Sequence, residues 1–140
     1  MNKYGLPHLC FPVILNIGNE VNAMTKEDME RLRQYTEAVK DLYGKHLQYL
    51  ILYGSRARGD NRKDSDYDIM GLVDLDDASI RKLRPRQADI DCEYFDRYDM
   101  YISSITKNID FFNRWVRAHP FYNNVWNEGV ALYERAEAVG

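Results

Sequence analysis

The sequence predicts a fold with both helices and strands, α/β in the broad sense and α+β in the strict one, in which a mixed β-sheet is flanked by helices. Three observations support this: an amphipathic helical repeat early in the chain, short runs of strand-forming residues after it, and helical segments between and after those runs. The chain has 140 residues, of which 45% are hydrophobic and 29% charged, so it has the length and composition for one globular core. We expect one domain over residues 24–140, preceded by an irregular N-terminal arm over residues 1–23.

The first expected element is a helix over residues 26–43. Thr25 and Asp28 resemble a capping box at its start, and apolar side chains follow at helical spacing. Residues 48–53 then form a short apolar run of strand formers, which is typical of a central strand covered on both faces. Residues 67–74 form a second strand candidate. The arm before the helix has no such period, because glycine and proline residues interrupt it.

The second half of the chain predicts a short helix, a strand and further helices. Residues 78–83 suit a short helix that ends before Pro85, and residues 88–95 alternate as a strand does, with Ile90, Cys92 and Tyr94 toward the core. Asp96 is a candidate N-cap for a helix that begins near Arg97. A helix over residues 110–118 follows, and residues 124–133 suit a helix, a stop at Gly129 and a short strand.

The composition argues against several classes of protein. A net charge of -3 provides no long-range attraction to nucleic acid, so we expect no general DNA or RNA binding. No apolar run reaches the roughly 18 residues of a membrane span, so we expect no membrane association. Cys10 and Cys92 lie far apart without a metal or redox motif, and the histidines do not cluster. We therefore expect reduced, buried thiols, no zinc site and a cytoplasmic location.

The segment that predicts chemistry runs from residue 52 to residue 70. A glycine at a strand end lets the backbone approach a phosphate group without a Cβ in the way, and Ser55 after Gly54 offers a hydroxyl and an N–H at a helix start. Asp66 and Asp68 are two residues apart in a predicted strand, so their carboxylates project from one face and can share divalent cations. Magnesium takes one or two protein carboxylates plus substrate phosphates, which matches this pair and a bound triphosphate.

Three other motifs fail on the same segment. The spacing of residues 54–59 fits a Walker A motif, but Asp60 and Asn61 stand where Lys and Ser or Thr belong. A calcium-binding loop that begins at Asp64 lacks the glycine and the final glutamate that such a loop requires. Residues 58–60 spell a cell-adhesion tripeptide, which is too short to be specific. The phosphate and metal interpretation is the one that uses the whole segment.

With these residues the sequence resembles the minimal nucleotidyltransferases of the DNA polymerase β superfamily, whose hallmark is Gly-Ser, ten residues, then Asp-x-Asp. Ser55 is followed by ten residues and then by Asp66-Tyr67-Asp68. The phrase Gly-Ser-Arg-Ala-Arg-Gly, the phrase Ser-Asp-x-Asp and the closing Glu-Gly-Val-Ala-Leu-Tyr-Glu at residues 128–134 also look familial. The resemblance implies a nucleotide-binding α/β core. Its implied nucleotide-binding residues are Gly54, Ser55, Arg56 and Ser65, although any of Arg56, Arg58, Arg62 and Lys63 could contact phosphate.

The resemblance also calls for a third acidic residue on a neighbouring strand. Asp89, Asp91 and Glu93 share one face of the strand predicted over residues 88–95, and alternation alone does not choose among them. Asp91 fits the family pattern best, with Asp89 as the alternative. By resemblance, Asp66, Asp68 and Asp91 are then the catalytic residues and the metal ligands, which hold two Mg²⁺ ions and help to remove the proton from an incoming hydroxyl.

The function implied by the resemblance is that of a Mg²⁺-dependent nucleotidyltransferase, which transfers a nucleoside monophosphate, AMP from ATP, to a hydroxyl acceptor. Larger relatives carry a helical domain for the acceptor, so we expect a partner to provide that surface here. In the family this partner is a HEPN toxin, and the expected role is an antitoxin that adds AMP to a tyrosine of the toxin. Two alternatives stay open: transfer to a small molecule such as an aminoglycoside, with a homo-oligomer completing the pocket, and a catalytically silent antitoxin that acts by complex formation.

Overall fold

The computed structural model describes residues 4–6 and 24–136, and residues 7–23 of the predicted arm, with Cys10, lie outside the described part. In chain order the elements are α1 (Lys26–Tyr43), the 3-10 helix η1 (Gly44–His46), β1 (Leu47–Tyr53), α2 (Ser55–Arg58), β2 (Tyr67–Val73), α3 (Asp77–Tyr98), β3 (Ile102–Asn108), α4 (Ile109–Trp115), α5 (Pro120–Glu128) and β4 (Val130–Glu134). The α+β fold class is confirmed. Among the described residues, no helix is both long and apolar enough to cross a membrane.

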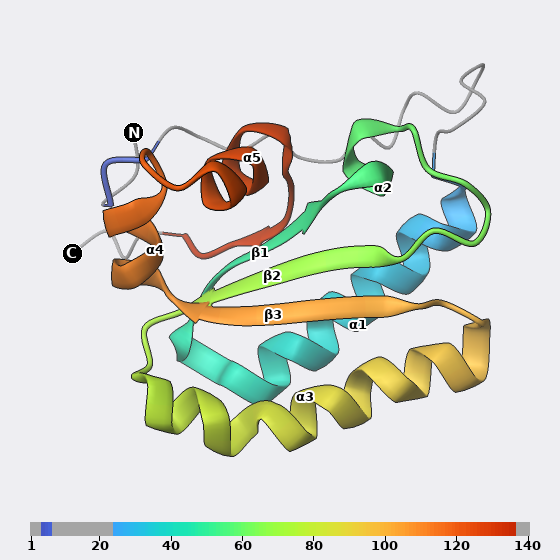
Figure 1. Ribbon diagram of the computed structural model, residues 1–140. Helices are drawn as coiled ribbons and strands as arrows, with labels where there is room; N and C mark the ends of the chain where they lie inside the picture. Colours follow the sequence, from blue (N-terminus) through green and yellow to red (C-terminus); the bar gives the residue numbers. More distant parts are fainter. Residues whose placement is uncertain (1–3, 7–23, 137–140) are drawn as a thin grey trace.

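The four strands form one mixed sheet in the order β3-β2-β1-β4. β1 runs antiparallel to β2 and to β4, whereas β2 runs parallel to β3. Helices α1 and α3 lie side by side against one face of this sheet, and α4 and α5 lie on its other side (Figure 1). The sheet therefore has two covered faces, as expected for a strand like β1 whose residues are nearly all buried.

Each face of the sheet has its own apolar core. Because successive side chains of a strand point to opposite faces, the residues of β2 divide between the two cores. Tyr67 and Ile69 belong to the core under α1 and α3, whereas Met70 and Leu72 belong to the core under α4 and α5. Leu6, from the short described part of the N-terminal arm, is 2% exposed and belongs to the second core. Because Asp68 is two residues before Met70 in the strand, its side chain points to the same side as Met70, toward α4 and α5.

The prediction for α1 is confirmed, including its cap. The helix covers Lys26–Tyr43, and the Thr25 side chain accepts a hydrogen bond from the Asp28 N–H at 3.0 Å. Such a cap satisfies one of the N–H groups that a helix leaves without a partner at its start. The apolar stripe of the helix is buried in the first core, where Leu32, Tyr35 and Val39 are each at most 1% exposed.

The strand predicted over residues 88–95 is wrong, because these residues belong to the 22-residue helix α3. Pro85 lies inside that helix, where proline costs about 3 kcal/mol, and its own side chain is exposed. The helix continues through it because side chains on both sides of Pro85 are buried or partly buried at spacings of three and four: Ile80, Leu83, Gln87, Ile90 and Tyr94. Ile90, Cys92 and Tyr94 had suggested a strand, but Cys92 is exposed and free, which corrects its predicted burial.

The helix predicted to begin near Arg97 is also wrong, since the chain leaves α3 at Asp99 and forms β3. Asp99 has φ 58° and ψ 32°, a left-handed conformation that ends the helix. The Tyr67 N–H then donates to the Tyr101 carbonyl at 2.7 Å, at the start of the parallel pairing between β2 and β3. The helix predicted over residues 110–118 corresponds to α4, and the helix, stop and strand predicted over residues 124–133 correspond to α5, Gly129 and β4.

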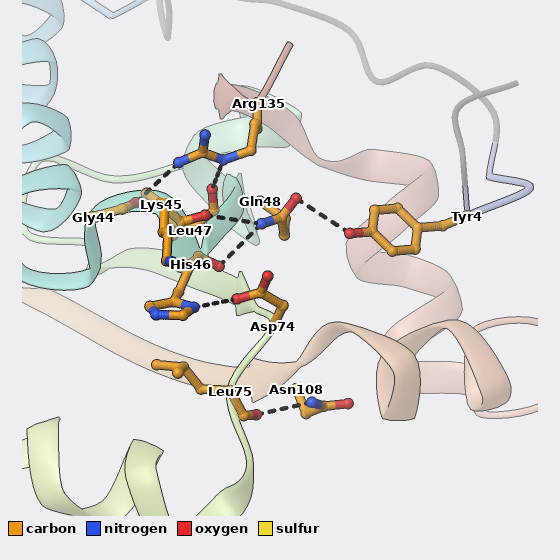
Figure 2. Close-up of polar contacts among 10 residues, drawn as sticks. All are labelled: Tyr4, Gly44, Lys45, His46, Leu47, Gln48, Asp74, Leu75, Asn108 and Arg135. Atoms are coloured by element: carbon orange, nitrogen blue, oxygen red, sulfur yellow. Dashed lines mark hydrogen bonds and ion pairs between the residues drawn. The ribbon is translucent and has the colours of Figure 1, made fainter. Parts of the chain in front are cut away.

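Polar contacts hold together the end of the sheet where β1 begins and β2 ends (Figure 2). The Arg135 guanidinium donates to the Leu47 and Gly44 carbonyls, at 3.1 Å each. The buried Gln48 amide donates to the Lys45 and His46 carbonyls and accepts from the Tyr4 hydroxyl. Nearby, His46 Nδ1 and Asp74 Oδ1 lie 2.7 Å apart. These contacts fix the end of the sheet that carries no candidate site residue.

A half-buried carboxylate joins α1, α3 and β3. Asp91 Oδ1 accepts from the Tyr35 hydroxyl at 2.6 Å and from Gln87 Nε2 at 3.1 Å, and Oδ2 accepts from the Ser104 hydroxyl. Burial raises the pKa of the Asp91 carboxyl, and the hydrogen bonds from Ser104, Tyr35 and Gln87 oppose that rise. Asp91 is thus the common acceptor of donors on α1, α3 and β3.

Replacing Asp91 by Ala leaves the Tyr35 and Ser104 hydroxyls without their acceptor, whereas Gln87 Nε2 still donates to the Tyr35 hydroxyl at 2.8 Å. We expect the free energy of unfolding to fall by about 2 kcal/mol, since a buried donor without a partner costs about 1–3 kcal/mol and removal of a half-buried charge offsets part of that cost. Urea unfolding followed by circular dichroism measures the change. Asp89→Ala, at an exposed position of the same helix, is the control and is expected to change stability by about 0.5 kcal/mol or less. Equal urea midpoints for the two variants would contradict the role of Asp91.

Candidate functional site

The candidate site lies where β1 ends and β2 begins. The chain leaves β1 at Tyr53, turns at Gly54, forms the single turn of α2 and returns to β2 at Tyr67. Because β1 and β2 are antiparallel neighbours, Tyr53 and Asp68 are direct partners across the sheet. The two ends of this 13-residue connection, residues 54–66, are therefore brought together, and the glycine of one end faces the aspartate of the other.

Gly54 has a conformation and a close contact with Asp68 that both require glycine. It has φ 75° and ψ -156°, a backbone conformation that L side chains rarely adopt. A Cβ at this position would lie 3.2 Å from Asp68 Cγ and would overlap its carboxylate oxygen Oδ2. The absent side chain thus leaves room for the Asp68 carboxylate against the backbone at the start of α2. There the first N–H groups of a helix have no helical acceptor.

Asp66 and Asp68 form a pair of carboxylates at this point. Asp66 immediately precedes β2 and is exposed, whereas Asp68 is half-buried in the strand. Burial raises the pKa of the Asp68 carboxyl above its ordinary value, the negative charge of Asp66 raises it further, and the positive charge of Arg58 lowers it. A divalent cation bound between the two carboxylates would relieve their mutual repulsion. Among the described residues no group of three acidic, histidine or cysteine side chains is placed to hold a metal.

Arg58 is the cation of the site, and the sequence alone did not single it out from the other basic residues of the loop. Its guanidinium contacts Glu128, at the end of α5, at 3.2 Å and Asp60 at 3.3 Å. All three side chains are exposed, so these ion pairs contribute little to stability. Their effect is to position the guanidinium near Asp68. Glu128 follows Arg58 by 70 residues, so no local pattern could have revealed the pair.

Arg56 and Ser65, both predicted to bind the nucleotide, hold the loop together in this structure. The Arg56 guanidinium donates to the Ser65 carbonyl and to the Lys63 carbonyl, and it stacks 4.0 Å above the Tyr67 ring. The Ser65 hydroxyl accepts from the Arg62 N–H at 2.7 Å. These contacts close the loop just before Asp66. Arg56 therefore faces the Tyr67 side of the sheet rather than the Asp68 side.

Asp91, predicted as the third carboxylate, is not brought to the pair. It lies on α3 rather than on a strand, and its Ser104 contact places it on the α1 and α3 side of the sheet, opposite to Asp68. Asp89, the alternative, is an exposed residue of the same helix. The strand that does lie beside Asp68 is β3, and the residue paired with Asp68 there is Ser103. Sequence reasoning missed Ser103 because it predicted a helix in place of β3.

Two aromatic side chains border the site. Tyr53 is half-buried, and its ring meets the exposed Phe121 ring edge-on at 5.7 Å between centroids. Burial, with a smaller contribution from the Asp68 charge, raises the pKa of Tyr53 to about 12. Tyr53 is therefore neutral at physiological pH and does not add to the negative charge of the pair.

The donor set fits one magnesium ion held together with a nucleotide. Magnesium takes oxygen ligands, usually one or two protein carboxylates with substrate phosphates and water. Asp66 and Asp68 supply two carboxylates, and that of Asp68 lies against the backbone at Gly54, in the space that a Cβ there would fill. Arg58 supplies a positive charge near the same place. The site thus combines groups that suit a divalent cation with groups that suit a phosphate.

Residues 37–138, most of the chain, match the family model described as polymerase beta, nucleotidyltransferase. A putative protein adenylyltransferase of Methanocaldococcus jannaschii is 29% identical over 102 residues, which cover 73% of this chain and 94% of that protein. The matched part of the chain includes the whole of the candidate site, from Gly54 to Glu128.

Two solved structures overlap with part of this fold. A toxin–antitoxin complex with AMP-PNP has a TM-score of 0.47 and 17% identity, over 74% of this chain and 73% of that chain. A tri-AMPylated Shewanella oneidensis HEPN toxin in complex with an MNT antitoxin has a TM-score of 0.45 and 16% identity, over 76% of this chain and 73% of that chain.

Gly54→Ala tests the fit between the turn and Asp68. The new Cβ would displace the Asp68 carboxylate and strain the backbone, so we expect the variant to lose binding of a magnesium nucleoside triphosphate by about 100-fold or more. Isothermal titration calorimetry with a non-hydrolysable ATP analogue measures the loss. Gly59→Asn is the control, because Gly59 has a left-handed φ of 82° that Asn tolerates and open space around it. Binding by Gly54→Ala at the level of Gly59→Asn would refute the fit.

The raised pKa of Asp68 predicts a pH dependence for nucleotide binding. Metal binding needs the ionised carboxylate, so binding falls as pH drops through a pKa that lies above the ordinary carboxyl value. Arg58 lowers this pKa. Its replacement by Gln therefore moves the loss of binding to higher pH. Binding curves of the magnesium ATP analogue over a pH series give the midpoint, with Arg62→Gln, an exposed cation of the same loop, as the control. An unchanged midpoint in Arg58→Gln would remove Arg58 from the site.

Proposed function

We propose that this chain, which belongs to the polymerase β nucleotidyltransferase family, transfers AMP from ATP to a hydroxyl group of a partner protein. The observation that supports the proposal most directly is the placement of Asp68, with Asp66 two residues before it, against the glycine turn at Gly54. Antiparallel strand pairing brings these two halves of the motif together. The arrangement suits a nucleoside triphosphate whose phosphates and cation lie between them.

Each group of the site has a separate task in this proposal. Gly54 leaves room for the Asp68 carboxylate against the turn, and Ser55 offers its hydroxyl and N–H to a phosphate oxygen. Asp66 and Asp68 hold Mg²⁺, which when bound offsets the negative charge of the phosphates and of the transition state. Arg58 lowers the pKa of the Asp68 carboxyl and adds positive charge beside it. The acceptor hydroxyl loses its proton to solvent water and its oxygen bonds to the α-phosphorus, and pyrophosphate leaves with the electron pair of the broken bond.

A protein is the proposed acceptor. The M. jannaschii relative is named a putative protein adenylyltransferase, and this chain aligns with nearly all of it. The resemblance of the Gly-Ser and Asp-x-Asp motif to minimal nucleotidyltransferases adds the finer proposal that the acceptor is a tyrosine of a HEPN-domain partner. AMP addition would silence that partner, and the chain would act as its antitoxin.

Transfer of label from ATP to the partner tests the proposal. The chain is co-expressed and co-purified with a HEPN-domain protein and incubated with Mg²⁺ and ATP labelled at the α-phosphate. We expect label on the partner, and we expect Asp66→Asn and Asp68→Asn to slow transfer by about 100-fold to 1,000-fold, the scale of removing one charge-stabilising group. Asp64→Asn is the matched control, because Asp64 is exposed in the same loop, outside the strand. Its rate should stay within about twofold.

Absence of label on the partner would refute the protein acceptor. Label that persists in both Asp66→Asn and Asp68→Asn would refute the proposed role of the pair. Neutralisation of the toxin by the two variants without any transfer would favour an antitoxin that works by complex formation alone.

A further inference from the structure

The residue beside Asp68 on the neighbouring strand is a serine. In the parallel register of β2 and β3, Tyr67 pairs with Ile102, Asp68 with Ser103 and Ile69 with Ser104. Ser103 is exposed and lies at the edge of the sheet, because β3 is the outermost strand on that side. It occupies the position on β3 from which a side chain can reach the place shared by Asp66 and Asp68.

The contacts of β3 show which of its side chains face the pair. Ser104 donates to Asp91, and Thr106 lies 3.2 Å from the Tyr43 hydroxyl, so both point toward α1 and α3. Ile105 packs against the core under α4 and α5, the side that Asp68 also faces. Because Ser103 and Ile105 are two residues apart in the strand, Ser103 points to the same side as Ile105. The hydroxyl of Ser103, and not a carboxylate, thus flanks the pair.

The predicted third carboxylate, Asp91, lies on the opposite face of the sheet. The Asp91 carboxylate accepts hydrogen bonds there from Tyr35, Gln87 and Ser104. Two divalent cations held 3.5–4 Å apart, as two-metal sites hold them, carry about four positive charges in a small volume. Beside the phosphates, the pair Asp66 and Asp68 supplies two protein carboxylates, while Asp60 and Glu128 are paired with Arg58. Among the described residues no group of three acidic, histidine or cysteine side chains is placed to hold a metal.

We propose that this site holds a single divalent cation for each bound nucleotide, shared by Asp66 and Asp68. A second cation does not bind because position 103 has a serine hydroxyl in place of a carboxylate ligand. The inference rests on the proposed function for the identity of the nucleotide, and it differs from the two ions expected from the motif. A carboxylate at position 103 would stand beside Asp68 and supply the ligand that a second ion lacks.

Counting ions tests this inference without reference to activity. The full chain is dialysed against Mn²⁺ with a non-hydrolysable ATP analogue, and electron paramagnetic resonance gives the bound Mn²⁺ per bound nucleotide. We expect a ratio of one in the unchanged chain and in Ser103→Asn, and a ratio of two in Ser103→Asp. The added carboxylate should tighten binding of the second ion about tenfold or more. Ser103→Asn matches Asp in size and lacks only its charge, and circular dichroism confirms that both variants fold.

Two outcomes would overturn the inference. A ratio of two in the unchanged chain means that the second ion finds ligands without a carboxylate at position 103. A ratio of one in folded Ser103→Asp means that position 103 does not reach the pair. The proposed function fails separately: a chain that binds one Mn²⁺ with the nucleotide but labels no partner supports the single ion and refutes the transfer. A chain that labels its partner with two ions bound does the reverse.

Discussion

The antiparallel pairing of β1 with β2 is the constraint on which the rest of the site depends. It places the end of one buried strand beside the start of the next, so that Tyr53 and Asp68 become partners. The connection between them must then pass over the Asp68 carboxylate at close range, and only glycine at position 54 allows that approach. The backbone of α2 and the two carboxylates take their places from this one pairing, and Glu128 and Asp60 then position the Arg58 guanidinium.

The electrostatic character of the site follows from that closeness. Asp68 is half-buried and lies near a second carboxylate, both of which disfavour its charge, and Arg58 compensates in part. A structure that keeps two acidic side chains so placed carries an unfavourable interaction in the absence of a cation. The charges on the other side of the sheet are arranged differently. Asp91 there receives three hydrogen bonds and needs no ion, which makes it a structural residue despite its acidic side chain.

Much of the fold could be predicted from local patterns. The capping residues and apolar stripe of α1, the buried run of β1 and the spacing from Ser55 to Asp66 are all short-range features, and the structure has α1 and β1 where they were expected. The strand predicted over residues 88–95 failed because Ile90, Cys92 and Tyr94 alternate by coincidence. The helical stripe that includes Ile80, Gln87 and Tyr94 extends across Pro85 and becomes clear only over the full length of α3. Ser103 and Arg58 depend on strand register and on a contact with Glu128, neither of which a local pattern contains.

The hydrogen bonds of Asp91 also fix the position of α3 along its own axis relative to the sheet. Apolar contacts tolerate sliding of a helix along its axis, whereas directed hydrogen bonds to Tyr35 on α1 and Ser104 on β3 do not. With Asp91 held in place and Asp99 ending the helix, the number of residues between Asp91 and β3 decides where the chain enters its strand. One residue fewer in that interval would shift β3 by one position and present Ser104 instead of Ser103 to Asp68. The position of Asp91 on one face of the sheet thus decides which residue of β3 lies beside Asp68 on the other face.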